Sequence, residues 1–419
     1  MKIARFVLCA VMAICVVGCP SKPGPAALGK VNVTFWHAMG GPLGDALKGM
    51  VDEFERENPD VHVELISMGG YSTLSQKLMG AVQVNAPPNM AQMYESWTSQ
   101  FHQLGKLVVL DSIVKGPDGL PPGELADFYP AFVEDNSWDS RLVTLPFNKS
   151  VPVFFYNIEM LRAAGYEKFP GTWDEFRVMV KKLTDSRKGI WGTVGGVNSW
   201  MFGCMLRQLG GDFMNAAWGK ATFNEPPGVQ AADYMYQLVA VDSSAMFGVG
   251  YDPQNDFLQG KIACIWGTSV SWAFMQENMT FPVGIAKVPT WQQPNVVSFG
   301  TNIGIFRTGT AEQVKACWRF IKWFTSAKQQ AAWATKTFYV PARRSSLQEP
   351  AYKELLGKIT GLEDELAQLE YMSFEPKDEA WFNGRKALDD ALEKIMRGEV
   401  KAQAALDEAA AELQKELAK

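Results

Sequence analysis

Residues 31–66, which read VNVTFWHAMGGPLGDALKGMVDEFERENPDVHVELI, decide the fold of this chain. Apolar residues alternate from Val31 to Phe35 and again from Val61 to Leu65, with the two-residue period of a β-strand. Between these runs, apolar residues recur every three or four positions from Leu43 to Phe54, the spacing of an amphipathic helix. Asn58-Pro59 ends that helix, because proline cannot continue it. The stretch therefore predicts a right-handed βαβ unit.

The carboxyl end of the first strand is the first candidate for a binding site. In an open α/β sheet, ligands bind in the crevice outside the carboxyl ends of parallel strands. Trp36 and His37 lie at that end, and Gly40-Gly41 at the following helix start could offer backbone amides to an anion. The next strand, from Met90, ends at Tyr94-Glu95. Strand ends therefore carry polar or aromatic residues repeatedly.

Length and charge limit the class of protein. A chain of 419 residues is too long for one ordinary core, so we expect two domains. The formal net charge of −5 argues against a nucleic-acid partner, which needs a basic surface. The stretch 142–157 has two extended runs around Pro146-Phe147-Asn148 and predicts the first crossing between the domains. The strand at 302–306 is the expected return crossing.

The first residues are predicted to form an export signal. Lys2 and Arg5 precede the apolar run Phe6–Val17, which is too short to span a bilayer and is typical of a secretory signal. The sequence that ends at Cys19 resembles a bacterial lipobox, so we expect a signal peptide at 1–18, a lipidated Cys19 and a flexible tether to residue 30. An ordinary signal peptide with an incidental cysteine is the alternative.

Motifs for bond-making chemistry are missing. The sequence has no Walker A loop, GxSxG, HExxH or CxxC, and the SxxK match at Ser112–Lys115 lacks its companion motifs. The cysteines after Cys19 match no metal spacing, and we expect them to be buried small hydrophobic residues. We therefore predict no catalytic residue, metal or cofactor.

A set of polar and aromatic residues at strand ends and turns suits a carbohydrate or polyol. Aromatic faces cover the C–H surfaces of a sugar, while hydroxyl, amide and carboxylate groups bond its hydroxyls. For each aromatic residue taken alone, core packing is the favoured interpretation, and only the recurrence of the set at strand ends indicates a site. The set is Trp36, His37, Tyr71, Tyr94, Glu95, Trp97, Ser150, Trp200, Ser269, Gly300 and Tyr339.

With these residues in view, the chain resembles the family 1 extracellular solute-binding proteins of bacterial ABC importers, and within them the branch that binds glycerol-3-phosphate and its sugar-binding relatives. The motifs that carry the resemblance keep the family's order over nearly the whole chain after the tether. They are FWHAMGGPLG (35–44), FERENPDVHVE (54–64), GGY (69–71), APPNMAQMYE (86–95), LPFNKSVPVFFYN (145–157), TWDEF (172–176), FLQGKIACIWGTS (257–269) and TKTFYVPAR (335–343).

The resemblance also implies ligand-binding residues. Carried over motif by motif, they are Tyr71, Glu95, Ser150, Ser269, Gly300, Tyr339 and, by spacing in the last helices alone, Arg385. In relatives of this branch, two aromatic residues stand three positions apart before a helix that here reads WMFG (200–203). In this chain Trp200 is present, but Val197 takes the other position. This departure weakens the case for a phosphorylated glycerol and leaves a neutral sugar open.

The resemblance implies an α/β, two-lobe periplasmic-binding-protein fold of type II, with the ligand cleft between hinge-connected lobes. We expect an N-terminal lobe of 31–142 plus 300–340 and a C-terminal lobe of 143–299 plus 341–419. The implied function is capture of a sugar, glycerol-3-phosphate or glycerophosphodiester for a membrane permease, by a monomer that is lipid-anchored outside the cytoplasmic membrane or in the periplasm. The competing interpretation is a lipid-anchored, glycan-active envelope enzyme that uses Glu95.

Overall fold

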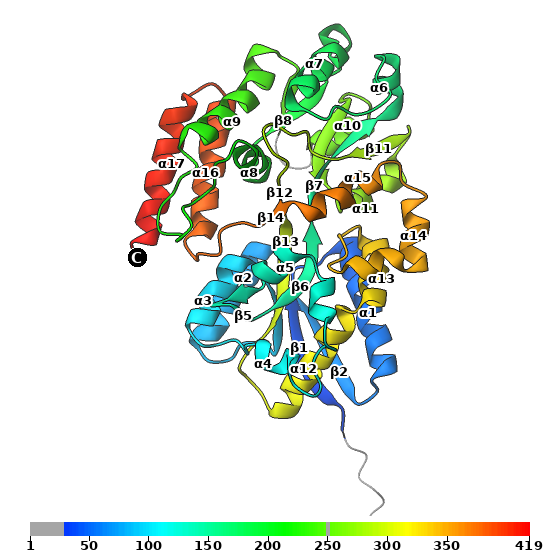
Figure 1. Ribbon diagram of the computed structural model, residues 1–419, viewed down its shortest axis with the longest axis vertical. Coiled ribbons are helices and arrows are strands. Elements are labelled where there is room, and N and C mark those ends of the chain that lie inside the picture. The colour runs from blue at the N-terminus through cyan, green and yellow to red at the C-terminus, as the bar shows by residue number, and fades with distance from the viewer. Residues whose placement is uncertain (1–28, 249–251) are drawn as a thin grey trace, which may run out of the picture.

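The computed structural model describes residues 29–248 and 252–419 of the chain, which form two lobes stacked along the long axis (Figure 1). The predicted signal peptide, the lipidated Cys19 and most of the tether lie outside the described residues. The lower lobe in Figure 1 holds the first strands, and the upper lobe holds the C-terminal helices.

The opening stretch folds as its pattern predicts. It forms β1 (Val31–His37), α1 (Gly41–Glu57) and β2 (Val61–Ser67). The two strands are parallel and in register from Val31 opposite Val61 to His37 opposite Ser67. α1 turns its apolar residues inward, including Leu47 and Phe54, because their spacing places them on one side of the helix. The predicted βαβ unit is confirmed.

The first lobe is built on a five-stranded sheet in the order β2-β1-β3-β13-β6. β3 runs parallel to β1, whereas β13 is antiparallel to both of its neighbours, β3 and β6. The central position of β13 means that a strand from late in the sequence completes the early sheet. The remaining strands are β3 (Met90–Met93), β6 (Leu145–Ser150) and β13 (Phe299–Ile305).

The chain changes sheets at Val151. β6 belongs to the first sheet, and β7 (Pro152–Asn157) is the central strand of a three-stranded antiparallel sheet, β10-β7-β11. Sheet membership therefore continues the first lobe about eight residues beyond 142, because Leu145–Ser150 pairs with β13. The other strands of the second lobe are β8 (Thr193–Gly196), β9 (Ala245–Gly248), β10 (Cys264–Thr268), β11 (Val283–Ala286), β12 (Val296–Val297) and β14 (Met372–Ser373).

Helices cover both sheets. In the part of the chain that the structure describes, no helix is both long and apolar enough to cross a membrane. Those of the first lobe are α1, α2 (Tyr71–Gln83), α3 (Glu95–Gln103), α4 (Asp111–Val114), α5 (Pro130–Asp135), α12 (Ala311–Phe324) and α13 (Ala327–Thr337). The others are α6 (Ile158–Ala163), α7 (Trp173–Leu183), α8 (Ser199–Gln208), α9 (Pro226–Tyr236), α10 (Asp252–Leu258), α11 (Ser271–Met275), α14 (Pro350–Leu356), α15 (Leu362–Ala367), α16 (Trp381–Met396) and α17 (Ala402–Leu417).

The three cysteines of the described residues are buried and free. They are Cys204, Cys264 and Cys317, and burial raises the pKa of both the Cys204 and the Cys264 thiol to about 12. Such thiols stay protonated and pack as small apolar side chains. The prediction that they are core residues is confirmed.

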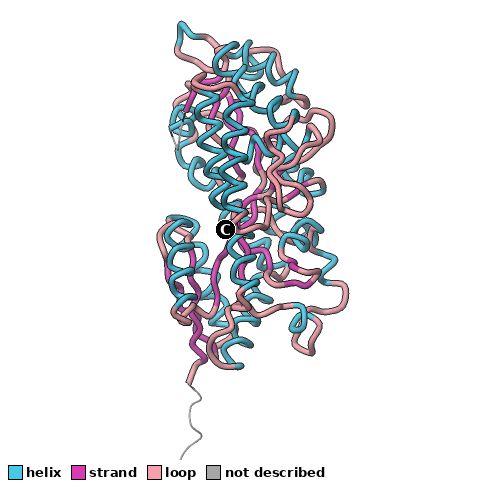
Figure 2. The backbone as a smooth tube through the Cα atoms, turned by 90° about the vertical axis from the view of Figure 1, so that its left-hand side faces the viewer, coloured by secondary structure: helices cyan, strands magenta, loops and turns pink. Residues whose placement is uncertain are grey.

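The tube view in Figure 2 shows the lobes one above the other, with the C-terminal helices on the near face of the upper lobe. The C-terminus lies close to the level at which the lobes meet. β6, β13 and the segment after α13 run side by side there, since β13 pairs with β6 and Val340 N–H donates to the Lys149 carbonyl at 2.8 Å. These segments position the residues of the site described next.

Candidate functional site

An open cleft with a volume of about 500 Å³ lies where the lobes meet, and residues of both lobes line it. The first lobe contributes the loops before α1 and α2 and the end of β6. The second lobe contributes α8, α10, α11 and the end of β10. Volume and position both fit a small-molecule site between domains. The lining residues are Ala38, Met39, Gly40, Leu43, Gly69, Tyr71, Tyr94, Asn148, Ser150, Trp200, Gln254, Thr268, Val270, Ser271, Phe274, Phe299, Gly300 and Tyr339.

Asn148 organises the floor of the cleft. Its side-chain amide nitrogen donates to the hydroxyl oxygen of Tyr71 at 3.1 Å and of Tyr339 at 2.9 Å. Its carbonyl oxygen accepts from the Thr301 backbone N–H at 3.0 Å, from the Thr301 hydroxyl and from Gln92 at 3.3 Å. Since only donors meet the oxygen, the orientation of the amide is fixed. Two tyrosines from distant segments are thereby held together on the floor.

Gly300 makes this arrangement possible. Its φ is +100°, and a Cβ on it would lie 1.7 Å from the backbone carbonyl oxygen of Asn148. Only glycine combines that backbone conformation with such a close approach. β13 can therefore lie directly against β6 under the cleft. The register shift between Thr301 and Asn302 lies beside the same point.

Two helices begin at the cleft without a side-chain cap. Gly40 precedes α1 and Gly70 precedes α2, and neither residue can cap a helix with a side chain. The first amides of a helix lack intrahelical acceptors and carry partial positive charge. Gly40, Gly69 and Tyr71 line the cleft. Hydroxyl or anionic oxygens of a ligand would find donors there.

Aromatic faces form the opposite wall. Trp200 of α8 stacks on Phe299, with ring centroids 4.3 Å apart and planes inclined by 38°. Phe274 of α11 is 46% exposed, which is unusual for so large an apolar side chain, and it also lines the cleft. Thr268, Ser271 and Gln254 supply hydroxyl and amide groups beside these rings. The wall thus combines apolar faces with hydrogen-bonding groups.

The sequence profile of a family described as bacterial extracellular solute-binding proteins matches residues 49–357. The chain belongs to this family. It is accordingly a protein of the extracellular or periplasmic space.

Individual relatives are similar over nearly their whole length. The chain is 23% identical over 402 residues to the sn-glycerol-3-phosphate-binding periplasmic protein UgpB of Pectobacterium atrosepticum, covering 90% of this chain and 89% of the relative. Its fold is similar to the ABC substrate-binding protein of Listeria monocytogenes in complex with cycloalternan (TM-score 0.81, 21% identity, 93% and 99% of the two chains). It is also similar to UgpB of Mycobacterium tuberculosis in complex with glycerophosphocholine (TM-score 0.80, 21% identity, 93% and 99%). The two-lobe fold expected from sequence is confirmed.

Within this solute-binding fold, half of the residues predicted for the site line the cleft. They are Tyr71, Tyr94, Ser150, Trp200, Gly300 and Tyr339. The other six, Trp36, His37, Glu95, Trp97, Ser269 and Arg385, are not among the residues that line the cleft. Their direct contact with a solute stays a prediction, and the structure gives each of them other partners.

Glu95 is part of a buried ionic cluster beside the floor. The Lys149 ammonium donates to the Glu95 carboxylate at 2.8 Å and to the Asp135 carboxylate at 2.6 Å. Burial and the neighbouring charge of Asp135 raise the pKa of Glu95 to about 8. Burial alone would lower the pKa of Lys149, but the two carboxylates raise it. Two acids share one cation, so burial and the second carboxylate favour the protonated form of Glu95.

Arg385 lies between aromatic rings at the edge of the site. Its guanidinium donates to Glu375 at 2.8 Å and lies 5.2 Å from the Trp200 ring centroid and 5.4 Å from that of Tyr94. The Tyr94 ring belongs to the first lobe, so this cation–π contact joins the lobes. The charge of Arg385 is already paired.

Ser269 fixes the end of β10 to the hinge rather than facing the cleft. Its hydroxyl donates to the Phe338 carbonyl at 2.6 Å, and the side chain lies beside the buried carboxyl of Glu365. Burial raises the pKa of Glu365 to about 8. Thr268 and Ser271, on either side along the chain, are the residues that line the cleft.

Trp36 and His37 support the cleft loop from below. The backbone N–H of Met39 donates to Nδ1 of His37 at 3.1 Å, and burial lowers the pKa of this imidazole. His37 is therefore neutral and accepts at Nδ1. Trp36 packs against the cluster that contains Tyr94 and Trp97.

Sequence reasoning missed Asn148, Gln254, Ser271, Phe274 and Phe299 as lining residues. Asn148 lies inside the quoted motif LPFNKS, two positions before the predicted site residue Ser150. An alternation argument along β6 would have placed Asn148 and Ser150 on the same face. Phe274 carried no sequence signal, because only its exposure distinguishes it from a core phenylalanine.

Proposed function

We propose that the chain is the solute-binding lipoprotein of an ABC importer, which captures a neutral saccharide in the cleft and delivers it to a membrane permease. One observation carries the choice of ligand. Among the described residues that line the cleft, none is Asp, Glu, Lys, Arg or His, while aromatic, hydroxyl and amide side chains are abundant. Such a lining suits C–H faces and hydroxyls rather than a full charge.

The basic residues nearest the cleft are already neutralised. Arg385 is paired with Glu375, and Lys149 with Glu95 and Asp135. Taking either cation from its carboxylate would leave a buried charge unpaired, at a cost of roughly 3–5 kcal/mol. A phosphate in the cleft would therefore depend on backbone amides.

Glycerol-3-phosphate or a glycerophosphodiester is the second candidate. The uncapped starts of α1 and α2 at the cleft favour an anionic oxygen. The names of the UgpB relatives point to the same ligand class. The neutral lining weighs against it.

Capture is proposed to proceed by closure of the lobes. The cleft has residues of both lobes around it. Tyr71 belongs to the first lobe, and Tyr339 belongs to the segment after α13 where the lobes meet. Trp200 and Phe274 belong to the second lobe. A solute that contacts both sides binds the closed form more tightly and shifts the population toward it. The closed form would then be the one presented to the permease, with the protein acting as a monomer.

Catalysis has no support in the geometry. A glycan hydrolase needs two carboxyl groups on either side of the scissile bond. Glu95 and Asp135 instead bind the same ammonium group and lie outside the cleft lining. The proposal is therefore binding without turnover, with Cys19 as the lipid attachment that keeps the protein at the cell envelope.

A thermal-shift screen tests the function. Maltose and trehalose represent neutral sugars, and sn-glycerol-3-phosphate and glycerophosphocholine represent the second candidate. We expect a saturable rise in melting temperature with a sugar and no product. Phe274→Ala should abolish most of that rise, because the aromatic face is lost from the cleft. Leu104→Ala, which removes an equally exposed apolar side chain (56%) outside the cleft, is the matched control.

A shift with the glycerophosphates alone would replace the neutral sugar by the second candidate. Product formation from any of the four compounds would overturn the binding role.

A further inference from the structure

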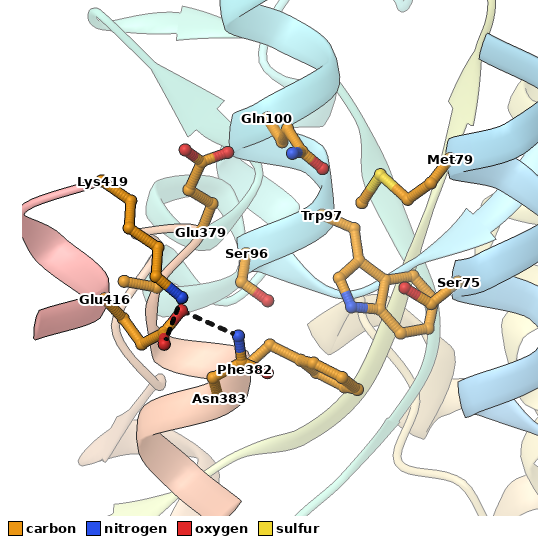
Figure 3. Close-up of a pocket in the computed structure, with 11 residues that line it drawn as sticks. Ser75, Met79, Ser96, Trp97, Gln100, Glu379, Phe382, Asn383, Glu416 and Lys419 are labelled. Carbon is orange, nitrogen blue, oxygen red and sulfur yellow. Dashed lines mark hydrogen bonds and ion pairs between the residues drawn. The ribbon is translucent and has the colours of Figure 1, made fainter. Parts of the chain in front are cut away.

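A second pocket lies between the lobes, at the side of the molecule where the C-terminal helices approach α2 and α3 (Figure 3). Its volume is about 280 Å³. Ser75, Met79, Trp97 and Gln100 line it from the first lobe, and Phe382 and Asn383 from α16. We call it the side pocket. None of its residues lines the cleft.

The side pocket contains an unused hydrogen-bond donor. The Trp97 side chain is only 2% exposed, and its indole nitrogen has no hydrogen-bond partner among the described residues. In Figure 3 this nitrogen is turned toward Ser96 and Phe382 across the pocket. A buried indole N–H usually finds a partner. An acceptor in the pocket would supply one.

The rim of the side pocket carries one ion pair and one exposed carboxylate that has no ion-pair partner among the described residues. Glu416 accepts from Lys419 at 2.6 Å and from Asn383 at 3.1 Å (Figure 3). Glu379 also lines the side pocket, and it is exposed. The interior therefore offers an indole N–H, the Gln100 amide and the face of Phe382. This is the chemistry of a neutral polyhydroxy ligand.

A small pocket of about 10 Å³, which we call the gap, lies between the side pocket and the cleft. Tyr94 lines both the cleft and this gap, and Ser96 and Phe382 line both the gap and the side pocket. Aromatic rings follow the same route. Centroid distances are 5.1 Å from Tyr71 to Tyr94, 5.2 Å from Tyr94 to Trp97 and 5.9 Å from Trp97 to Phe382.

We propose that the side pocket is a second carbohydrate subsite, which takes the outer hexose units of a linear oligosaccharide whose first units occupy the cleft. This inference rests on the proposed saccharide-binding function and extends it to ligand length. The cross-lobe contacts of Arg385 with Tyr94 and of Phe382 with Trp97 open to admit the chain. A sugar unit in the side pocket then contacts both lobes and favours their closure.

The test measures affinity against chain length. Linear malto-oligosaccharides of two to six glucose units are titrated by calorimetry into the wild-type protein and into Gln100→Ala and Phe382→Ala. Gln103→Ala is the matched control, because Gln103 is an exposed glutamine on the same helix that does not line the pocket. Melting temperatures verify that each variant folds.

We expect wild-type affinity to rise with length and the disaccharide to bind all variants equally. Gln100→Ala and Phe382→Ala should each reduce the affinity for the longer sugars about five- to ten-fold, which is the effect of losing one hydrogen bond or one aromatic contact. A flat length profile, or a rise that both variants keep, overturns the subsite while leaving the proposed function intact. If no member of the series binds, the glucan form of the proposed function fails and the subsite fails with it.

Discussion

Replacing Asn148 by alanine should damage both stability and solute binding, for separable reasons. The substitution removes the acceptor for the Thr301 amide and for Gln92, and these donors lie in a fully buried environment. At about 1–3 kcal/mol for each of the two buried donors left unpaired, the expected loss of unfolding free energy is about 2–6 kcal/mol. The tyrosine hydroxyls can turn to water in the cleft, so they contribute little to that loss.

Binding depends on the tyrosines instead. Without the amide that fixes their oxygens at 3.1 and 2.9 Å, Tyr71 and Tyr339 lose their common orientation, and we expect affinity to fall about ten-fold or more. Urea denaturation with an unchanged m-value measures the first effect, and calorimetry with the solute found in the thermal screen measures the second.

Asn157→Ala is the control for this experiment. Asn157 is also buried, but it caps α6 by accepting from the Met160 N–H at 3.0 Å, away from the cleft. It should cost about 1 kcal/mol and leave affinity unchanged. A stability loss under about 1 kcal/mol for Asn148→Ala, together with wild-type affinity, would refute the role given to Asn148.

Three further predictions follow from the structure. Gly300→Ala should destabilise the protein by more than about 2 kcal/mol and abolish binding, because the new Cβ meets the Asn148 carbonyl at 1.7 Å; Gly105→Ala, with positive φ but open space, should cost only about 1 kcal/mol in the same urea titration. Lys149→Met should lower the unfolding free energy by about 3–5 kcal/mol, because two buried carboxyl groups lose their cation; a smaller loss would show that the cluster is solvated. Glu365 has a folded pKa of about 8, raised by burial, so its stabilising effect is full below about pH 4.5 and is lost as pH rises through 8. Melting temperatures from pH 5 to 9 should therefore fall less steeply in Glu365→Gln than in wild type, and equal slopes would contradict this assignment.

The sequence predicts those parts of the fold that depend on the spacing of apolar residues within a single segment. The βαβ unit, the capping box of Thr172 and Glu175 at the start of α7, and the helices α12 and α13 follow from apolar spacing and end signals. The position of β13 between β3 and β6 could not be predicted in this way, because the residue pattern within a strand does not indicate which strands it pairs with. From the sequence, this strand could be expected only as a crossing between the domains.

For the site, the resemblance located motifs rather than side-chain directions. Ser269 and Glu95 lie in the right motifs, yet their own polar partners hold them behind the lining. Ser269 bonds the backbone carbonyl of Phe338, and Glu95 pairs with Lys149. Both partners are distant in the sequence, so no local pattern indicates these contacts. Phe274 shows the converse: nothing but its exposure in the folded chain marks it as a site residue.

Because β13 comes late in the sequence but lies inside the first sheet, it also limits the order in which the two sheets can form. Until residues 299–305 exist, β3 and β6 have no strand between them and their inner edges stay unpaired. The β10-β7-β11 sheet needs only residues 152–286 and can assemble earlier during synthesis. The N-terminal half of the polypeptide is therefore the last to acquire its finished sheet, and a nascent chain stalled before residue 299 would expose adhesive strand edges.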